Sequence, residues 1–161
     1  MANPPVRTID LLPLTKDEAA MVAAGKRSDG EQWAEGYPRE DDVQPCAGLA
    51  DSAEDRGPFG VYRIVPLEHG QTIGTAGFYG PPDASGEVTI GYGMVEPEWG
   101  KGYGTEAVAG LIEVCRAHGG VTVVNADTDL DNIGSQRVLE KNGFEWVRTT
   151  DELCYFALRL N

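Results

Sequence analysis

The stretch Glu98-Trp99-Gly100-Lys101-Gly102-Tyr103-Gly104-Thr105-Glu106-Ala107 decides how the rest of the chain is interpreted. Its glycines alternate, which permits positive φ angles and a close approach of the backbone to a ligand. An amphipathic helix follows directly, because apolar residues recur at helical spacing: Val108, Leu111, Ile112 and Cys115. A flexible turn at a helix N-terminus offers free N–H groups and the positive end of the helix dipole. The stretch therefore predicts an anion site, for which phosphate is the usual occupant.

Two common nucleotide-binding motifs do not fit this stretch. A nucleoside triphosphate loop needs Gly-Lys followed by Ser or Thr, whereas Lys101 lies between two glycines. A dinucleotide fingerprint needs a third glycine where Ala107 stands, and no second nucleotide-binding half follows. The local pattern is also compatible with a glycine turn that only begins an ordinary helix.

Two longer segments are similar to a known family. Gly91-Tyr92-Gly93-Met94-Val95, with Pro97 to Ala107 after it, resembles motif A of the GCN5-related N-acetyltransferases (GNAT). Asp131 to Ser135, with Val138 to Glu145 after it, resembles motif B of that family. The resemblance covers roughly residues 86–148 and is greatest to the RimJ/RimL-like branch. One departure is Trp99, which stands where the family usually has Gln or Arg.

The resemblance implies an α/β (α+β) GNAT fold for residues 1–161 as a single domain. We expect a mixed central sheet of six to seven strands, about four flanking helices and a splayed parallel strand pair at the cofactor site. Residues 25–57 would lie on the acceptor side, and residues 86–148 would form the acetyl-CoA-binding core. The sequence pattern predicts strands over 6–12, 59–65, 71–79, 87–95, 121–126, 144–149 and 153–160. It predicts helices over 15–24, 31–34, 41–53, 102–117 and 131–142, the last one capped by Asp131.

Composition limits the partners. The chain has 26 acidic and 13 basic residues, a formal net charge of −13, which argues against nucleic acid as a partner. The charge fits a cationic acceptor, and solubility alone would also explain it. No apolar run approaches the ~20 residues of a membrane span, and three cysteines without Cys-x-x-Cys spacing indicate neither a disulfide framework nor a zinc site. We expect a cytoplasmic monomer or homodimer without a metal or a membrane partner.

The resemblance assigns acetyl-CoA as the cofactor, with coenzyme A as the product. The pantetheine arm would bond to the main chain at Met94 and Val95, with an N–H near Val95 donating to the thioester carbonyl. Asn132 would hydrogen-bond the pantetheine, and Ser135 would meet the sulfur as an acid. The pyrophosphate would lie within the turn formed by Gly100, Lys101, Gly102, Tyr103, Gly104 and Thr105.

The general base and the acceptor site are less well defined by the sequence. RimJ/RimL-like enzymes often carry a glutamate where this chain has Thr89, so Glu87 on the same strand face is the nearest substitute. Glu31, Glu35 or a water relay are alternatives. The acceptor-binding candidates are Glu31, Trp33, Glu35, Tyr37 and Thr89, although both aromatic residues would equally serve as packing anchors.

The resemblance implies an enzyme that moves an acetyl group directly, through a ternary complex, to a primary amine. The amine could belong to a protein N-terminus, an amino acid or polyamine, or an amine-bearing antibiotic. The missing glutamate leaves open a non-catalytic acyl-CoA-binding module or sensor on the same fold. Ser135 favours the enzyme, because a module that only binds needs no acid for a thiolate.

Overall fold

The computed structural model describes residues 6–160. Within them, seven strands form one sheet in the order β1-β2-β3-β4-β5-β7-β6, and only β4 and β5 pair in parallel. The strands are β1 (Ile9–Pro13), β2 (Val61–Pro66), β3 (Gly74–Phe78), β4 (Glu87–Met94), β5 (Val123–Asp129), β6 (Glu145–Thr149) and β7 (Leu153–Arg159). The helices are α1 (Lys16–Ala23), α2 (Glu40–Ala50), α3 (Tyr103–His118) and α4 (Ile133–Lys141), with a short 3-10 turn at Glu96–Glu98. The predicted fold class is confirmed.

Local signals set most of the helix ends. Thr15 accepts a hydrogen bond from the Glu18 N–H while the Glu18 carboxylate accepts from the Thr15 N–H, so a capping box begins α1. Gly119 ends α3 with φ of 79°, and Gly143 follows α4 with φ of 89°, a region that favours glycine.

Several predictions of local structure are wrong, and four of them concern the site or its supports. No helix forms over 31–34; this segment runs beside the start of the β3 hairpin, where Trp33 bridges to Thr72. The first strand begins at Ile9, where the Glu106 carboxylate accepts the main-chain N–H groups of Thr8 and Ile9. The strand expected to end at Ala126 continues through Asp129 along β7. Asn132 rather than Asp131 caps α4.

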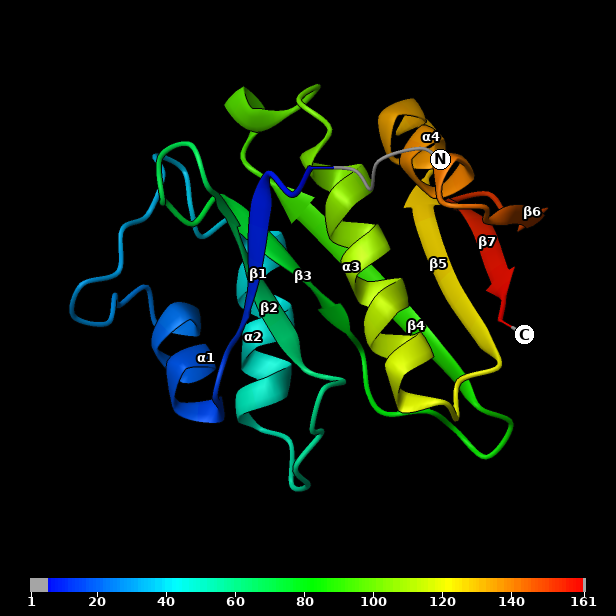
Figure 1. The fold of residues 1–161 in the computed structure, drawn as a ribbon, viewed down its shortest axis with the longest axis horizontal. Coiled ribbons are helices and arrows are strands. Elements are labelled where there is room, and N and C mark those ends of the chain that lie inside the picture. The colour runs from blue at the N-terminus through cyan, green and yellow to red at the C-terminus, as the bar shows by residue number, and fades with distance from the viewer. Residues whose placement is uncertain (1–5, 161) are drawn as a thin grey trace.

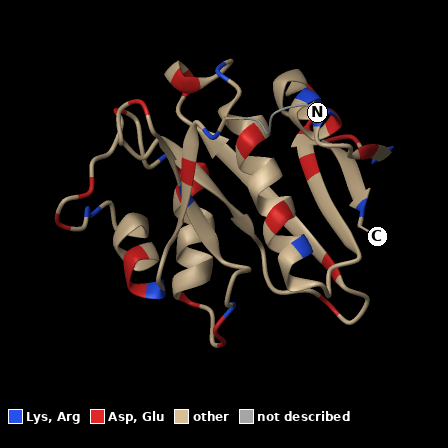
Figure 2. Ribbon diagram, viewed as in Figure 1, with Lys and Arg blue, Asp and Glu red and all other residues tan. Residues whose placement is uncertain are grey.

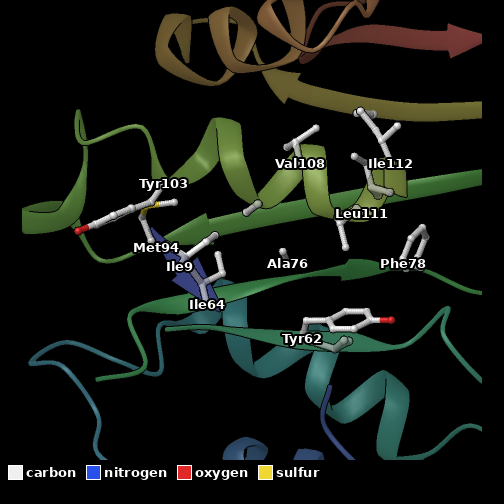
Figure 3. Packing of buried hydrophobic residues seen from close by; sticks show 14 of the residues in the cluster. Ile9, Tyr62, Ile64, Ala76, Phe78, Met94, Tyr103, Val108, Leu111 and Ile112 are labelled. Carbon is white, nitrogen blue, oxygen red and sulfur yellow. The ribbon is translucent and has the colours of Figure 1, made fainter. Parts of the chain in front are cut away.

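The helices cover both faces of the sheet (Figure 1). Helices α1 and α2 pack together on one face against β2 and β3, whereas α3 lies on the other face against β1, β3 and β4. The apolar stripe expected on α3 is buried, as Figure 3 shows for Val108, Leu111 and Ile112 above the sheet. Because α4 contacts both α3 and β5, it lies on the α3 side of the sheet, beside the parallel pair.

Candidate active site

The parallel strands β4 and β5 separate after a short paired segment. Their ladder runs only from Glu87 opposite Val123 to Thr89 opposite Asn125, and then the two strands diverge toward their carboxyl ends (Figure 1). Beyond that point β5 stays paired with β7, and β4 stays paired with β3. The splayed pair predicted from the resemblance is therefore present.

A cavity of about 450 Å³ lies at this divergence and is lined from both faces of the sheet. Asp41 and Gln44 of α2 and Asp127 of β5 line it on the α1–α2 face. Tyr92 of β4 and Ser135 of α4 line it on the α3 face. Its volume is within the range of small-molecule sites. The gap between the strands thus connects the two faces.

Every second residue of β4 directs its main-chain N–H and C=O groups toward the gap between β4 and β5. The Tyr79 N–H donates to the Thr89 carbonyl at 3.0 Å and the Val95 N–H to the Ile73 carbonyl at 2.9 Å, so odd-numbered residues bond to β3. By this register, the N–H groups of Tyr92 and Met94 face the gap. Val95 as a donor to a ligand is wrong, because its N–H is already used within the sheet.

Trp99, which stands where the family usually has Gln or Arg, binds the main chain of β4 through its side chain. Its indole N–H donates to the Met94 carbonyl at 2.8 Å, although the ring is largely exposed. This hydrogen bond ties the turn that precedes α3 to the end of β4. It also uses the Met94 carbonyl, so the N–H is the group that Met94 can offer to a ligand.

The glycine-rich turn has the expected backbone at two of its three glycines. Gly100 and Gly102 have φ of 77° and 85°, and a Cβ at either would have no neighbour within 4 Å. Gly104 lies inside α3 without a positive φ, and a Cβ there would approach the Tyr92 ring to 3.2 Å. Gly104 is therefore needed for packing. The Tyr103 side chain is 6% exposed and packs against the core (Figure 3), so its main-chain N–H at the start of α3 is the group placed to contact an anion.

Lys101 is already paired beside this turn. Its ammonium lies 2.9 Å from Glu98, which also contacts the His69 ring at 3.0 Å. Partial burial acts to raise the pKa of Glu98, but the hydrogen bonds from Lys101 and His69 outweigh it and lower the pKa. The same carboxylate raises the pKa of Lys101. Lys101 would have to exchange this partner to reach a phosphate.

Asn132 and Ser135 lie together at the start of α4 but have different partners. The Asn132 side-chain oxygen accepts the Ser135 N–H at 3.1 Å and so caps the helix, which leaves the Asn132 amide group as a donor. The Ser135 hydroxyl lies 2.6 Å from the Tyr92 hydroxyl. The sequence analysis assigned no role to Tyr92 and so missed this contact.

The residues predicted to bind the acceptor do not line the cavity. Glu31 forms an ion pair with Arg63 at 3.2 Å and accepts the Trp33 indole N–H at 2.8 Å. Trp33 meets Tyr37 edge-on with ring centroids 5.3 Å apart, and Tyr37 is only 6% exposed. These three residues form a packing cluster. Glu35 is exposed and likewise stands outside the residues that line the cavity.

Glu87 and Thr89 lie before the point of divergence. The Glu87 carboxylate accepts a hydrogen bond from the Asn125 amide at 3.1 Å, within the paired part of the two strands. Thr89 is the last residue of that ladder, and neither side chain lines the cavity. Because each strand residue advances ~3.3 Å, Glu87 is about 13 Å along β4 from Gly91 at the cavity. The placement of Glu87 outside the cavity lining therefore does not favour it as the base.

Asp127, Tyr79 and Asp41 line the cavity on the α1–α2 face instead. Asp127 follows Asn125 by two residues in β5 and so shares its face. The cavity walls remove part of its hydration, and this desolvation, with a smaller contribution from Asp129, raises the pKa of Asp127. Desolvation also raises the pKa of Tyr79, with Asp127 and then Asp41 adding to it. Sequence reasoning missed Asp127 because it ended the strand at Ala126, three residues before the end of β5.

The glycines of β4 leave space for side chains on the α1–α2 face of the sheet. A Cβ at Gly93 would lie 2.5 Å from the Arg39 guanidinium, and one at Gly91 would lie 2.9 Å from the Tyr79 hydroxyl. Arg39 donates two hydrogen bonds of 2.9 Å to the fully buried Asp42 carboxylate, which also accepts from Thr75 at 2.7 Å. This network fixes the start of α2 against the sheet.

Across residues 6–160, no group of three or more His, Cys, Asp or Glu side chains is arranged to hold a metal ion. In the same part of the chain, no helix combines the length and apolar character needed to cross a membrane.

This fold, with a cavity at a splayed parallel pair and a glycine turn before α3, is the architecture expected of an acyl-CoA-dependent transferase. A sequence model described as "Acetyltransferase (GNAT) domain" matches residues 8–145. The chain belongs to the GNAT acetyltransferase family, as its motifs predicted.

Individual curated relatives match only about half of this chain. The uncharacterized N-acetyltransferase YjdG of Bacillus subtilis (strain 168) is 36% identical over 86 residues, which are 53% of this chain and 51% of that protein. The chain spans about half the length of the curated relatives that it matches, 51% and 47%.

Solved structures cover nearly all of the chain. Mycobacterium smegmatis RimJ in complex with CoA-disulfide has a TM-score of 0.66 at 20% identity, covering 94% of this chain and 81% of that one. The aminoglycoside acetyltransferase AAC(6')-Ib in complex with coenzyme A has a TM-score of 0.61 at 25% identity, covering 94% and 95%. The likeness to RimJ establishes the fold alone.

Proposed function

We propose that this chain is an acetyl-CoA-dependent N-acetyltransferase that acts on a primary amine within one domain formed by residues 1–161. The observation that carries the proposal is the cavity at the β4–β5 divergence, which is lined by residues from both faces of the sheet. Two substrates that react directly must meet at one place, and this cavity brings residues of both faces to one place. Structures of two neighbours contain coenzyme A or its disulfide, which supports the same cofactor here.

The residues of the α3 face fit acetyl-CoA. When bound, acetyl-CoA supplies the acetyl thioester. The N–H groups of Tyr92 and Met94 face the gap and would hold the pantetheine amides and the thioester carbonyl, as backbone donors do in other oxyanion sites. The free N–H groups of the turn from Gly100 to Thr105 would receive the pyrophosphate at the N-terminus of α3. The Asn132 amide and the Ser135 hydroxyl would then lie beside the thiol end.

The α2 face fits an ammonium group. An acceptor amine must lose a proton before it attacks a carbonyl carbon, and this requires a nearby base. Asp127 lines the cavity on this face, and its raised pKa moves it toward the range of a useful base. Its carboxylate would bind the protonated amine and then take the proton. We therefore assign Asp127 the role that the sequence suggested for Glu87.

The test is a screen of the full chain for thiol release from acetyl-CoA with panels of amines. The panels contain peptides with free N-termini, amino acids, polyamines and aminoglycosides, and mass spectrometry of the acceptor must show one added acetyl group. We expect turnover with at least one cationic amine. Tight binding of acetyl-CoA without transfer to any amine would overturn the enzyme and favour a non-catalytic acyl-CoA-binding module.

A further inference from the structure

The Tyr92 and Ser135 hydroxyls form a bridge across the gap between β4 and α4. Their oxygens are 2.6 Å apart, the length of a strong O–H···O hydrogen bond. Both residues line the cavity. The Ser135 N–H is held by Asn132, so the main chain that carries the hydroxyl is fixed as well.

We propose that Tyr92 is a positioning residue that donates to the Ser135 hydroxyl and thereby points the Ser135 proton at the leaving sulfur. The inference rests on the proposed acetyl transfer and adds a residue that neither motif assigned to it. A serine hydroxyl has only one proton, so its usefulness as a donor depends on where its neighbour directs that proton.

The direction of the hydrogen bond follows from acidity. A phenol is a stronger acid than an aliphatic alcohol, so Tyr92 is the better donor of the pair. The other acceptor within reach of its proton, the Ser135 carbonyl, is 3.4 Å away and therefore weaker. Burial raises the pKa of Tyr92, with the Ser135 hydrogen bond acting against this, so the phenol stays protonated at neutral pH. Ser135 must then accept, and its own proton is free to turn into the cavity.

The Tyr92 ring is held in place by its surroundings. Gly104 of α3 presents its bare backbone to the ring, because a Cβ there would approach the ring to 3.2 Å. The ring is therefore confined between β4 and the first turn of α3. Gly104 therefore contributes both to the glycine-rich turn and to the position of the Tyr92 hydroxyl.

In the proposed step, the acetyl group passes directly from sulfur to nitrogen. The amine nitrogen forms a bond to the carbonyl carbon, and the carbon–sulfur bond breaks with its electron pair remaining on sulfur. The Ser135 O–H donates a hydrogen bond to this thiolate, and the Tyr92 O–H strengthens that donor by polarising it. The bound ammonium gives one proton to Asp127 and from there to water before the attack, and the nitrogen loses a second proton by the same route as the amide forms. Water returns one proton to the thiolate after release, so one proton is released overall. Tyr92 and Ser135 end the reaction unchanged.

The test compares Tyr92→Phe, Ser135→Ala and the double variant in the thiol-release assay. Tyr92→Phe keeps the ring and loses one hydrogen bond, so we expect kcat to fall about 3- to 10-fold, with the KM of acetyl-CoA within twofold. Ser135→Ala should lower kcat about 10- to 10³-fold. Because Tyr92 acts only through Ser135, adding Tyr92→Phe to Ser135→Ala should change nothing further. Tyr62→Phe, another partly buried tyrosine whose hydroxyl donates to the Pro58 carbonyl, controls for lost stability.

The outcomes separate the two proposals. Turnover by the wild type together with full activity of Tyr92→Phe overturns the role of Tyr92 and leaves the acetyl transfer intact. An equal loss from Tyr92→Phe in both backgrounds also overturns it, because a purely structural effect would persist without Ser135. Absence of transfer by the wild type with every amine overturns both proposals together.

Discussion

Replacing Arg39 by Met should destabilise the protein strongly, because it leaves a buried charge without its partner. The Asp42 carboxylate is fully buried and accepts two hydrogen bonds from the Arg39 side chain, one from the Arg39 main-chain N–H and one from Thr75. Removing one partner of a buried pair costs about 3–5 kcal/mol. Because the Arg39 side chain is 26% exposed, water can partly replace it, and we expect the lower end, about 3 kcal/mol.

The loss is measured by urea and thermal unfolding. For a domain of this size, 1 kcal/mol lowers the melting temperature by about 2–4 °C, so the change should be roughly 6–12 °C with an unchanged urea m-value. Arg7→Met is the matched control: Arg7 is 72% exposed and pairs with Asp10 at 3.4 Å. Such an exposed pair should contribute less than about 1 kcal/mol.

A second substitution isolates the charge from the packing. Adding Asp42→Asn to Arg39→Met removes the unpaired negative charge while keeping the side-chain oxygen that accepts from Thr75. The double variant should recover about half of the lost stability, because desolvation of a charge is the main cost. A loss below about 1 kcal/mol for Arg39→Met, or a double variant less stable than the single one, would refute the reasoning.

Three further predictions concern the site. Gly102→Val should abolish acetyl-CoA binding in calorimetry while the protein stays folded, because a Cβ there meets nothing within 4 Å but the φ of 85° disfavours it. Gly25→Val, with φ of 72° and equal space, is the control. Unchanged affinity of Gly102→Val would refute the turn as the pyrophosphate site. Asp127→Asn should lower kcat/KM by about 10²- to 10⁴-fold. In the wild type, activity should fall as the pH drops through the Asp127 pKa, which is raised above the ordinary 3.8. Asp129→Asn should move this acidic limb of the pH–activity profile to lower pH. If Asp127→Asn leaves the acidic limb in place, Asp127 is not the base. Glu31→Gln should lower the melting temperature and leave the acceptor KM unchanged, whereas a raised KM would return this residue to the acceptor site.

The sequence predicted those parts of the fold that depend on neighbouring residues. The apolar stripe of α3 is read from spacings of a few positions, and its burial is confirmed. The failures depend on distant partners. Residues 31–34 have a weak helical pattern, but their main chain bonds to Thr72, nearly forty positions away. The end of β5 is set by β7, whose register no local pattern contains.

The same distinction holds within the candidate site. The turn at Gly100 and Gly102 was predictable because its chemistry is contiguous in the chain. Which N–H groups of β4 face the gap depends on the pairing of β4 with β3, and this moved the donor from Val95 to its even-numbered neighbour Met94. The Tyr92–Ser135 contact joins residues 43 positions apart, so no motif spacing could have indicated it.

The acidity of the chain and the chemistry of the cavity have separate explanations. Acidic residues occur along the whole ribbon and outnumber basic ones (Figure 2). Charges at the surface are screened beyond about 8–10 Å at physiological salt, so most of them act on a ligand only as a weak long-range attraction. At the cavity, Asp41 and Asp127 face Arg39 and Arg56, and the charge of Arg39 is already balanced by the buried Asp42. With Arg39 balanced in this way, the two carboxylates and Arg56 leave a formal charge of about −1 on the cavity lining. The net charge of −13 belongs to the whole chain, so it is no guide to the identity of the acceptor in the proposed reaction.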